Sequence, residues 1–95
     1  MKKSKLHSNS LKRYRKARGL TQKEAAKILG LKSTSMISRW EKGVCLPNAL
    51  NIFRLAVLYR TMADALFIDL LRALRDELHK REEEVLGNKT GGQNG

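Results

Sequence analysis

Apolar residues recur at helical spacing along most of the chain, and glycines separate the stretches that carry them. Gly19, Gly30, Gly43 and Gly87 each follow such a stretch, and glycine is favoured just past a helix end because it adopts the left-handed conformation without penalty. No alternating run of β-branched residues indicates a strand. The pattern therefore predicts an all-α fold of five helices, at about residues 9–18, 22–29, 34–42, 48–58 and 62–86.

Capping residues support the predicted helix starts. Thr21 and Glu24 form a T-x-x-E capping box before the second helix. Asn48 is placed to cap the fourth helix and Thr61 the fifth, while Ser8 or Ser10 is placed to cap the first. We expect each of these side chains to bond a backbone N–H group that the first helical turn leaves without a partner.

The two C-terminal helices carry different apolar patterns. Between Ala49 and Leu58 only Asn51 and Arg54 are polar, so the pattern predicts a helix at the centre of the core. The segment 62–86 is apolar in its first half and charged in its second. As one helix it would be about 37 Å long, so we expect its distal part to project or to meet a partner.

The charge is concentrated at one end of the chain. The protein has 95 residues and a net charge of +11, and residues 1–43 hold 13 Lys/Arg against two acids, whereas residues 44–95 hold seven of each. A basic half of this kind suggests a polyanionic partner, either nucleic acid or an anionic membrane. A basic surface that is merely solvated would have the same composition. The basic half has no long helix with a wide apolar face, which disfavours the membrane.

The candidates for metal or enzyme chemistry are few. Cys45 is the only cysteine, and it combines with His7 and His79 at no spacing typical of a metal site. No nucleophile–base set, phosphate loop or pair of carboxylates is visible, so we expect no enzyme activity, cofactor or metal. No signal peptide and no uncharged stretch of about 20 residues is present. The sequence therefore predicts a cytoplasmic protein that does not span a membrane.

The third predicted helix has one apolar side and one polar side. Ile37 and Trp40 share a face, and the residues at i, i+3, i+4 and i+7 on the opposite face are Ser35, Ser38, Arg39 and Lys42. Two short helices joined at Gly30 suggest a helix-turn-helix, in which the second helix enters the major groove of DNA. Small side chains allow close approach, and Arg39 is long enough to bond a guanine edge at two atoms.

Several segments in a fixed order carry a family resemblance. They are Leu11-Lys-Arg-Tyr-Arg15, Gly19-Leu-Thr-Gln-Lys-Glu-Ala-Ala26, Leu29-Gly30, Ile37-Ser-Arg-Trp-Glu-Lys-Gly43 and Pro47. Together they resemble the phage-repressor-like, Xre-type helix-turn-helix family over about residues 9–67. The resemblance implies a five-helix repressor-like domain that binds double-stranded DNA, usually as a dimer on a palindromic operator.

The same resemblance implies roles for individual residues. It implies base contacts for Thr34, Ser35, Ser38 and Arg39 and a phosphate contact for Gln22. We also expect phosphate contacts from Lys32, Ser33 and Lys42. Arg15 and Glu41 are expected to form a structural ion pair. One departure concerns the turn, because Ile37 lies seven residues after Gly30 where the family usually has six. We assign the extra residue to the segment 31–34, where it affects how the third helix enters the groove and which of Ser33, Thr34 and Ser35 reads bases.

The remaining segments give the domain organisation. We expect a basic flexible arm at 1–8, an extension of the fifth helix at 68–86 and a disordered tail at 87–95. The apolar residues that recur along one side of the extension are Leu71, Leu74, Leu78 and Val85. They predict a dimer interface, and the alternative is a monomer in which the three leucines fold back on the first helix.

The sequence thus predicts a sequence-specific DNA-binding transcriptional regulator, acting as a dimeric repressor. The alternative is an antitoxin-like protein that binds a toxin-like partner protein through its C-terminal segment and regulates its own synthesis through DNA.

Overall fold

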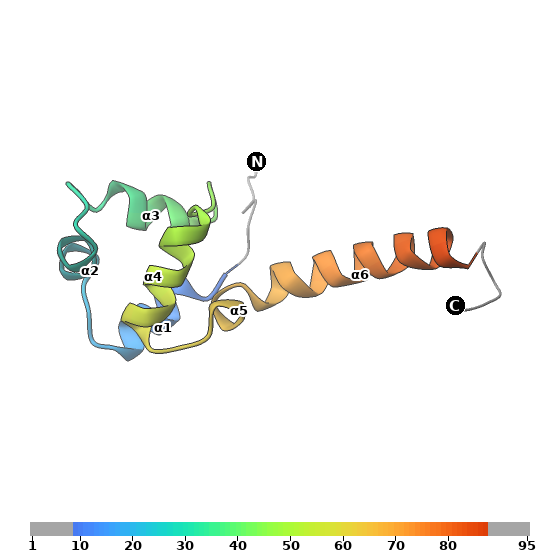
Figure 1. Cartoon of the computed structure of the whole chain (residues 1–95). Coiled ribbons are helices and arrows are strands. Elements are labelled where there is room, and N and C mark those ends of the chain that lie inside the picture. The colour runs from blue at the N-terminus through green and yellow to red at the C-terminus, as the bar shows by residue number, and fades with distance from the viewer. Residues whose placement is uncertain (1–8, 88–95) are drawn as a thin grey trace.

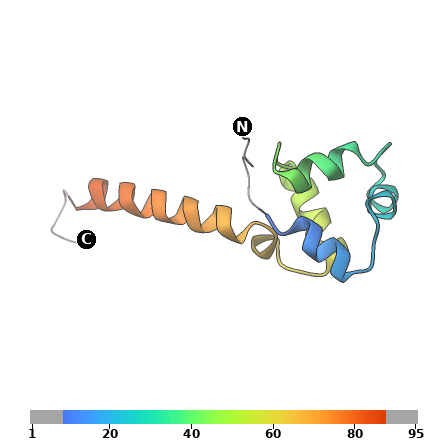
Figure 2. The same cartoon turned by 180° about the vertical axis from the view of Figure 1, so that it is seen from behind.

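Six α-helices follow one another in the computed structural model, which describes residues 9–87. They are α1 (Leu11–Ala17), α2 (Gln22–Leu29), α3 (Ser35–Lys42), α4 (Ala49–Tyr59), α5 (Ala63–Leu66) and α6 (Ile68–Leu86). Helices α1 to α5 gather into one domain, and α6 projects away from it (Figures 1 and 2). The described residues contain no strand, so the predicted all-α class is confirmed. The predicted arm at 1–8 and the tail beyond Gly87 lie outside the described residues.

The core lies where α1 to α5 meet. Its buried hydrophobic residues are Leu11, Ala25, Ala26, Leu29, Ile37, Trp40, Leu55, Ala56, Tyr59, Leu66 and Phe67. They come from every helix of the domain, and α6 contributes none of them. The five short helices therefore share one core, from which α6 extends.

The predicted ends of the first three helices are confirmed. Gly19, Gly30 and Gly43 all have φ between 73° and 77°, the left-handed conformation that favours glycine. Gly87 was expected to behave in the same way, but its φ of −61° is an ordinary helical value. That prediction is wrong, because α6 ends without a left-handed cap.

Two of the predicted caps are confirmed. The Thr21 hydroxyl accepts from the Glu24 N–H at 3.0 Å, and the Glu24 carboxylate accepts from the Thr21 N–H at 2.9 Å. The Asn48 side chain accepts from the Asn51 N–H at 2.8 Å. The prediction for Thr61 is wrong, whereas that for Ser10 is confirmed in position only, since Ser10 directly precedes α1; Ser8 lies outside the described residues. The Ser10 side chain makes no capping bond, and Met62, not Thr61, precedes α5.

The segment predicted as one helix over 62–86 is broken at Phe67. This residue has φ −132° and ψ 40°, outside helical values, and it separates α5 from α6. Leu66 and Phe67 are 0% and 4% exposed, although successive residues of a continuous helix point about 100° apart. The Leu66 carbonyl also accepts from the Ser10 N–H at 2.8 Å. Burial of both side chains and this bond to the start of α1 account for the break.

Helix α4 is buried on one side only. Leu55 and Tyr59 face the core, whereas Leu50, Phe53 and Val57 are exposed. The prediction that α4 is surrounded by core is therefore wrong. A domain of this size buries a limited share of its surface, and no element covers the outer side of α4.

Helix α6 meets the domain at its first turn, where the half-buried Leu70 packs against the core. Leu71, Leu74 and Leu78 are exposed, so they do not fold back on α1 as the monomeric alternative required. No helix within residues 9–87 is long and apolar enough to cross a membrane.

Candidate nucleic-acid interface

Helices α2 and α3 flank a turn formed by residues 30–34. Gly30 ends α2, and the Leu31 N–H returns to the Ala26 carbonyl at 2.8 Å. The Ser33 hydroxyl accepts from the Ser35 N–H at 3.2 Å, which places Ser33 at the start of α3. Ile37 is buried despite its unusual distance from Gly30. The turn thus contains the extra residue without rotating the inner face of α3 out of the core.

The two sides of α3 have opposite surroundings. Ile37 and Trp40 are buried in the core and hold the helix in place. On the other side Ser35, Arg39 and Lys42 are exposed, and Thr34 and Ser38 are half-buried. The structure therefore brings all four predicted base-contacting residues to the outer side and the N-terminal end of one helix.

Met36 is an exposed residue of α3 that the sequence pattern does not single out. It lies three residues before Arg39, so the two share a side of the helix. A methionine at this position offers apolar contact of the kind that the thymine methyl group accepts. The three-residue spacing between Met36 and Arg39 is the signal that could have placed Met36 on the outer side of α3.

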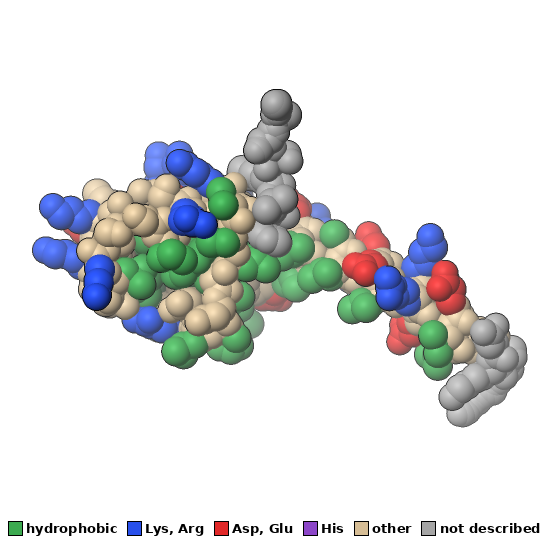
Figure 3. Space-filling model, turned by 90° about the horizontal axis from the view of Figure 1, so that it is seen from above, with side chains coloured by type: hydrophobic (Ala, Val, Ile, Leu, Met, Phe, Trp, Pro, Cys, Tyr) green, Lys and Arg blue, Asp and Glu red, His purple; other side chains and the backbone are tan. Residues whose placement is uncertain are grey.

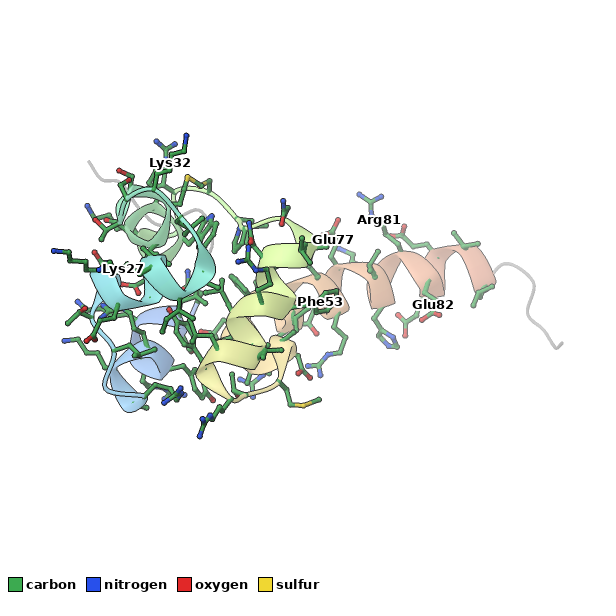
Figure 4. All side chains as sticks on the ribbon, turned by 60° about the vertical axis from the view of Figure 1, so that its left-hand side comes forward. Lys27, Lys32, Phe53, Glu77, Arg81 and Glu82 are labelled. Atoms are coloured by element: carbon green, nitrogen blue, oxygen red, sulfur yellow. The ribbon has the colours of Figure 1, made fainter. Side chains whose placement is uncertain are left out.

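The surface around α2 and α3 is rich in cations. Lys23 and Lys27 on α2, Lys32 in the turn and Lys42 on α3 are all exposed. Figure 4 shows Lys27 and Lys32 projecting away from the domain, and Figure 3 shows Lys and Arg side chains gathered around this part of it. Residues 9–62 contain only two acids, of which Glu24 is engaged in the capping box and Glu41 is buried.

Glu41 is paired with Arg15 beneath α3. The Arg15 Nε atom donates to Glu41 Oε2 at 2.6 Å, and a terminal guanidinium nitrogen donates to Oε1 at 3.1 Å. The other terminal nitrogen donates to the Leu20 carbonyl at 2.9 Å. Both residues are buried, so the pair joins α1, the loop before α2 and the end of α3.

Gln22 belongs to the same network. Its side-chain nitrogen donates to Glu41 Oε1 at 3.0 Å. An amide nitrogen carries two N–H groups, so the second remains able to donate to another acceptor. The structure places Gln22 at the first position of α2, where backbone N–H groups and the helix dipole favour an anion.

The buried network changes two pKa values. The hydrogen bond with Glu41 raises the pKa of Arg15 above its ordinary value, and the attraction of the two charges adds to it. Burial raises the pKa of Tyr59 to about 12, and the nearby charge of Glu41 contributes in the same direction. Arg15 is therefore charged and Tyr59 neutral at physiological pH.

The residues with metal-binding or nucleophilic side chains are scattered. Cys45 is a half-buried free thiol. His79 lies on α6 with 3.7 and 3.5 Å between its ring nitrogens and the carboxylates of Glu82 and Glu83. Among residues 9–87, no group of three or more His, Cys, Asp or Glu side chains has an arrangement that could hold a metal ion.

Comparison with known proteins identifies the family. No curated protein and no solved structure shows significant similarity to the chain. A family model described as helix-turn-helix matches residues 11–66, which is more than half of the chain and contains α1 to α5. The chain therefore belongs to the Xre-like helix-turn-helix family of DNA-binding transcription regulators.

Proposed function

We propose that the protein is a repressor that reads a palindromic operator with α3 and binds it as a homodimer. The observation that carries this proposal is the contrast between the two sides of α3. Its inner side is fixed by Ile37, Trp40 and the Glu41 network, while its outer side presents exposed polar and cationic residues. A rigid helix with such a face is what readout in the major groove requires.

Base contacts are assigned to the start and outer side of α3. Arg39 bonds a guanine edge through two of its nitrogens, the commonest specific contact. Thr34, Ser35 and Ser38 have short side chains that bring the helix close to the bases. Arg39 is exposed, so its side chain can reach a base edge.

Phosphate contacts are assigned to the residues that flank the groove. Gln22 donates its second amide N–H to a phosphate oxygen while Glu41 holds its first. Lys32, Ser33 and Lys42 lie at the turn and at the end of α3. Contacts of this kind fix the position of a protein on the duplex and carry no sequence information by themselves.

Dimerisation is assigned to α6. Leu71, Leu74, Leu78 and Val85 are all exposed on this helix, and exposed apolar patches mark interaction sites. One small domain reads only a few base pairs, so a two-fold dimer gains specificity by reading two half-sites. A dimer bound over a promoter excludes polymerase sterically, which is the regulatory outcome we propose.

Selection from random-sequence DNA, followed by sequencing, tests the proposal. We expect an enriched inverted repeat whose affinity falls steeply between about 50 and 200 mM salt. Arg39→Ala should relax the preference at one position of each half-site. Lys42→Ala, as the matched phosphate variant, should weaken all sequences alike and reduce the salt slope by about 1. Failure to enrich any motif would contradict sequence-specific readout.

A second function is favoured by the exposure of α6. A helix that no part of the domain covers can bind another protein, and an antitoxin uses such a segment to hold its toxin. Co-purification with the product of a neighbouring gene would favour this function. A homodimer that forms from the pure chain would favour the first.

A further inference from the structure

A second apolar surface lies on the outer side of α2 and α4, apart from the DNA interface. We call it the α2–α4 trough. Its most exposed apolar residues are Ile28, Phe53, Val57 and Met62, and Val57 is 79% exposed. Two concavities of about 300 and 600 Å³ meet at Val57. A continuous patch of this kind on a small domain marks an interaction site.

The charges of the trough indicate the chemistry of its occupant. Arg54 and Arg60 line it, and no acidic residue does. Arg54 is held by bonds to the Asn51 side chain and the Leu29 carbonyl, whereas Arg60 is exposed at the end of α4. A complementary occupant is a helix with one apolar stripe and acids beside it.

Helix α6 has that composition. Its apolar stripe is formed by Leu71, Leu74, Leu78 and Val85. These residues follow alternating three- and four-residue spacing, in which Arg81 occupies the position between Leu78 and Val85. The positions that flank this stripe include the acids Glu77, Glu82 and Glu84 and one cation, Arg75. Over its length α6 carries six acids and four Lys/Arg, a net charge of −2, in a chain whose net charge is +11.

Two copies of α6 are poorly matched to each other. In a parallel pair Arg81 would occupy the seam opposite Arg81 of the second copy, and Glu77 would face Glu82. Like charges that face each other oppose association, whereas the trough presents Arg54 and Arg60 to the acids that flank the stripe.

The α6 of the same chain does not reach the trough. Leu66 and Phe67 are buried immediately before α6 begins, and the Leu66 carbonyl is bonded to the Ser10 N–H. These contacts fix the direction in which α6 leaves the domain, and both views show it pointing away (Figures 1 and 2). The stripe and the trough are therefore available only to a second molecule.

We propose that, in the homodimer, α6 of each copy packs its stripe into the α2–α4 trough of the other. This inference rests on the homodimer of the proposed function and names the surface that α6 binds. Figure 3 shows hydrophobic side chains on the surfaces of both the domain and α6, and in a reciprocal exchange two molecules bury both surfaces. The exchange buries the trough and leaves the outer side of α3 free for DNA.

Sedimentation of single variants, without DNA, tests which surfaces meet. Val57→Glu and Leu78→Glu should each raise the dimer dissociation constant at least about tenfold, because each places a charge in an apolar interface. Val44→Glu is the matched control, because Val44 is an exposed apolar residue outside the trough and the stripe, and it should remain dimeric. All three sites are exposed, so circular dichroism should show unchanged helix content.

Thiol cross-linking distinguishes the exchange from pairing between α6 helices. In a Cys45→Ala background, a mixture of Val57→Cys and Leu78→Cys chains should form the mixed disulfide on mild oxidation. A disulfide between two Leu78→Cys chains, with no mixed product, would overturn the exchange and leave the homodimer standing. A wild-type chain that is monomeric at high micromolar concentration would refute the homodimer itself and the exchange with it.

Discussion

Loss of the Glu41 carboxylate is expected to destabilise the protein more than loss of any surface ion pair. Glu41→Ala removes the acceptor of two bonds from Arg15 and one from Gln22. The Arg15 guanidinium keeps only its bond to the Leu20 carbonyl. Because Arg15 is 6% exposed, its charge would remain in the domain without a counter-charge.

The magnitude follows from that burial. Removal of one partner from a buried ion pair costs about 3–5 kcal/mol, because the other charge is left uncompensated. A small domain is stable by only about 5–15 kcal/mol. Glu41→Ala should therefore remove a large fraction of the free energy of unfolding and leave the domain partly unfolded near 37 °C.

Urea unfolding followed by tryptophan fluorescence measures this loss. Trp40 is the only tryptophan, is buried, and is adjacent to Glu41. Asp76→Ala is the matched control, since it removes an exposed ion pair with 3.7 Å between Asp76 Oδ1 and Arg75 Nε. Exposed pairs contribute about 0.2–1 kcal/mol, so the control should unfold almost as the wild type does.

The double variant Arg15→Met with Glu41→Leu separates the charge from the packing. It removes both buried charges and keeps much of the apolar volume, a replacement that is often neutral or stabilising. We expect it to be more stable than Glu41→Ala. A loss of less than about 1 kcal/mol in the free energy of unfolding of Glu41→Ala would refute the reasoning. The Arg15–Glu41 pair would then contribute no more than a solvent-exposed ion pair does.

The remaining predictions concern α3 and the core. Trp40→Ala should lower the free energy of unfolding by about 3–5 kcal/mol. Trp40→Phe should lower it much less, because the indole N–H of Trp40 has no partner among the described residues. Urea unfolding followed by circular dichroism measures both. Arg39→Ala should leave the melting temperature unchanged and weaken binding to the selected site by about 1–3 kcal/mol; a lower melting temperature would place Arg39 in the fold instead. Tyr59 keeps its proton up to about pH 12 in the folded chain, whereas the unfolded chain loses it near pH 10. The folded state therefore binds more protons in this range, so stability should fall as pH rises from about 10 to 12, and thermal melts of Tyr59→Phe should show a smaller fall.

Local signals made the first half of the fold predictable. The Thr21 capping box and the glycines at positions 19, 30 and 43 act within one helical turn of the ends that they mark. Their effect depends on neighbouring residues, so it can be recognised in the sequence. The inward positions of Ile37 and Trp40 followed from their spacing for the same reason.

The features that the sequence did not predict depend on tertiary contacts. The break at Phe67 needs a bond from Ser10, which is 56 residues earlier than Leu66 in the chain. The outer side of α4 is as apolar as its inner side, so its pattern does not reveal that Phe53 and Val57 are exposed. Helical periodicity describes a helix alone and contains no information on how many neighbours will cover it.

In the candidate site, the link between Gln22 and Glu41 also depends on tertiary contacts and could not be predicted from the sequence. The sequence assigned Gln22 to phosphate and Glu41 to a structural pair as two separate roles. In the structure one carboxylate bonds both Arg15 and Gln22. Glu41 lies on α3, the helix that we propose reads DNA, where an exposed acid would repel phosphate, but its charge is buried and compensated. The same acid that fixes α3 to α1 therefore also orients the first side chain of α2 toward the expected position of the DNA backbone.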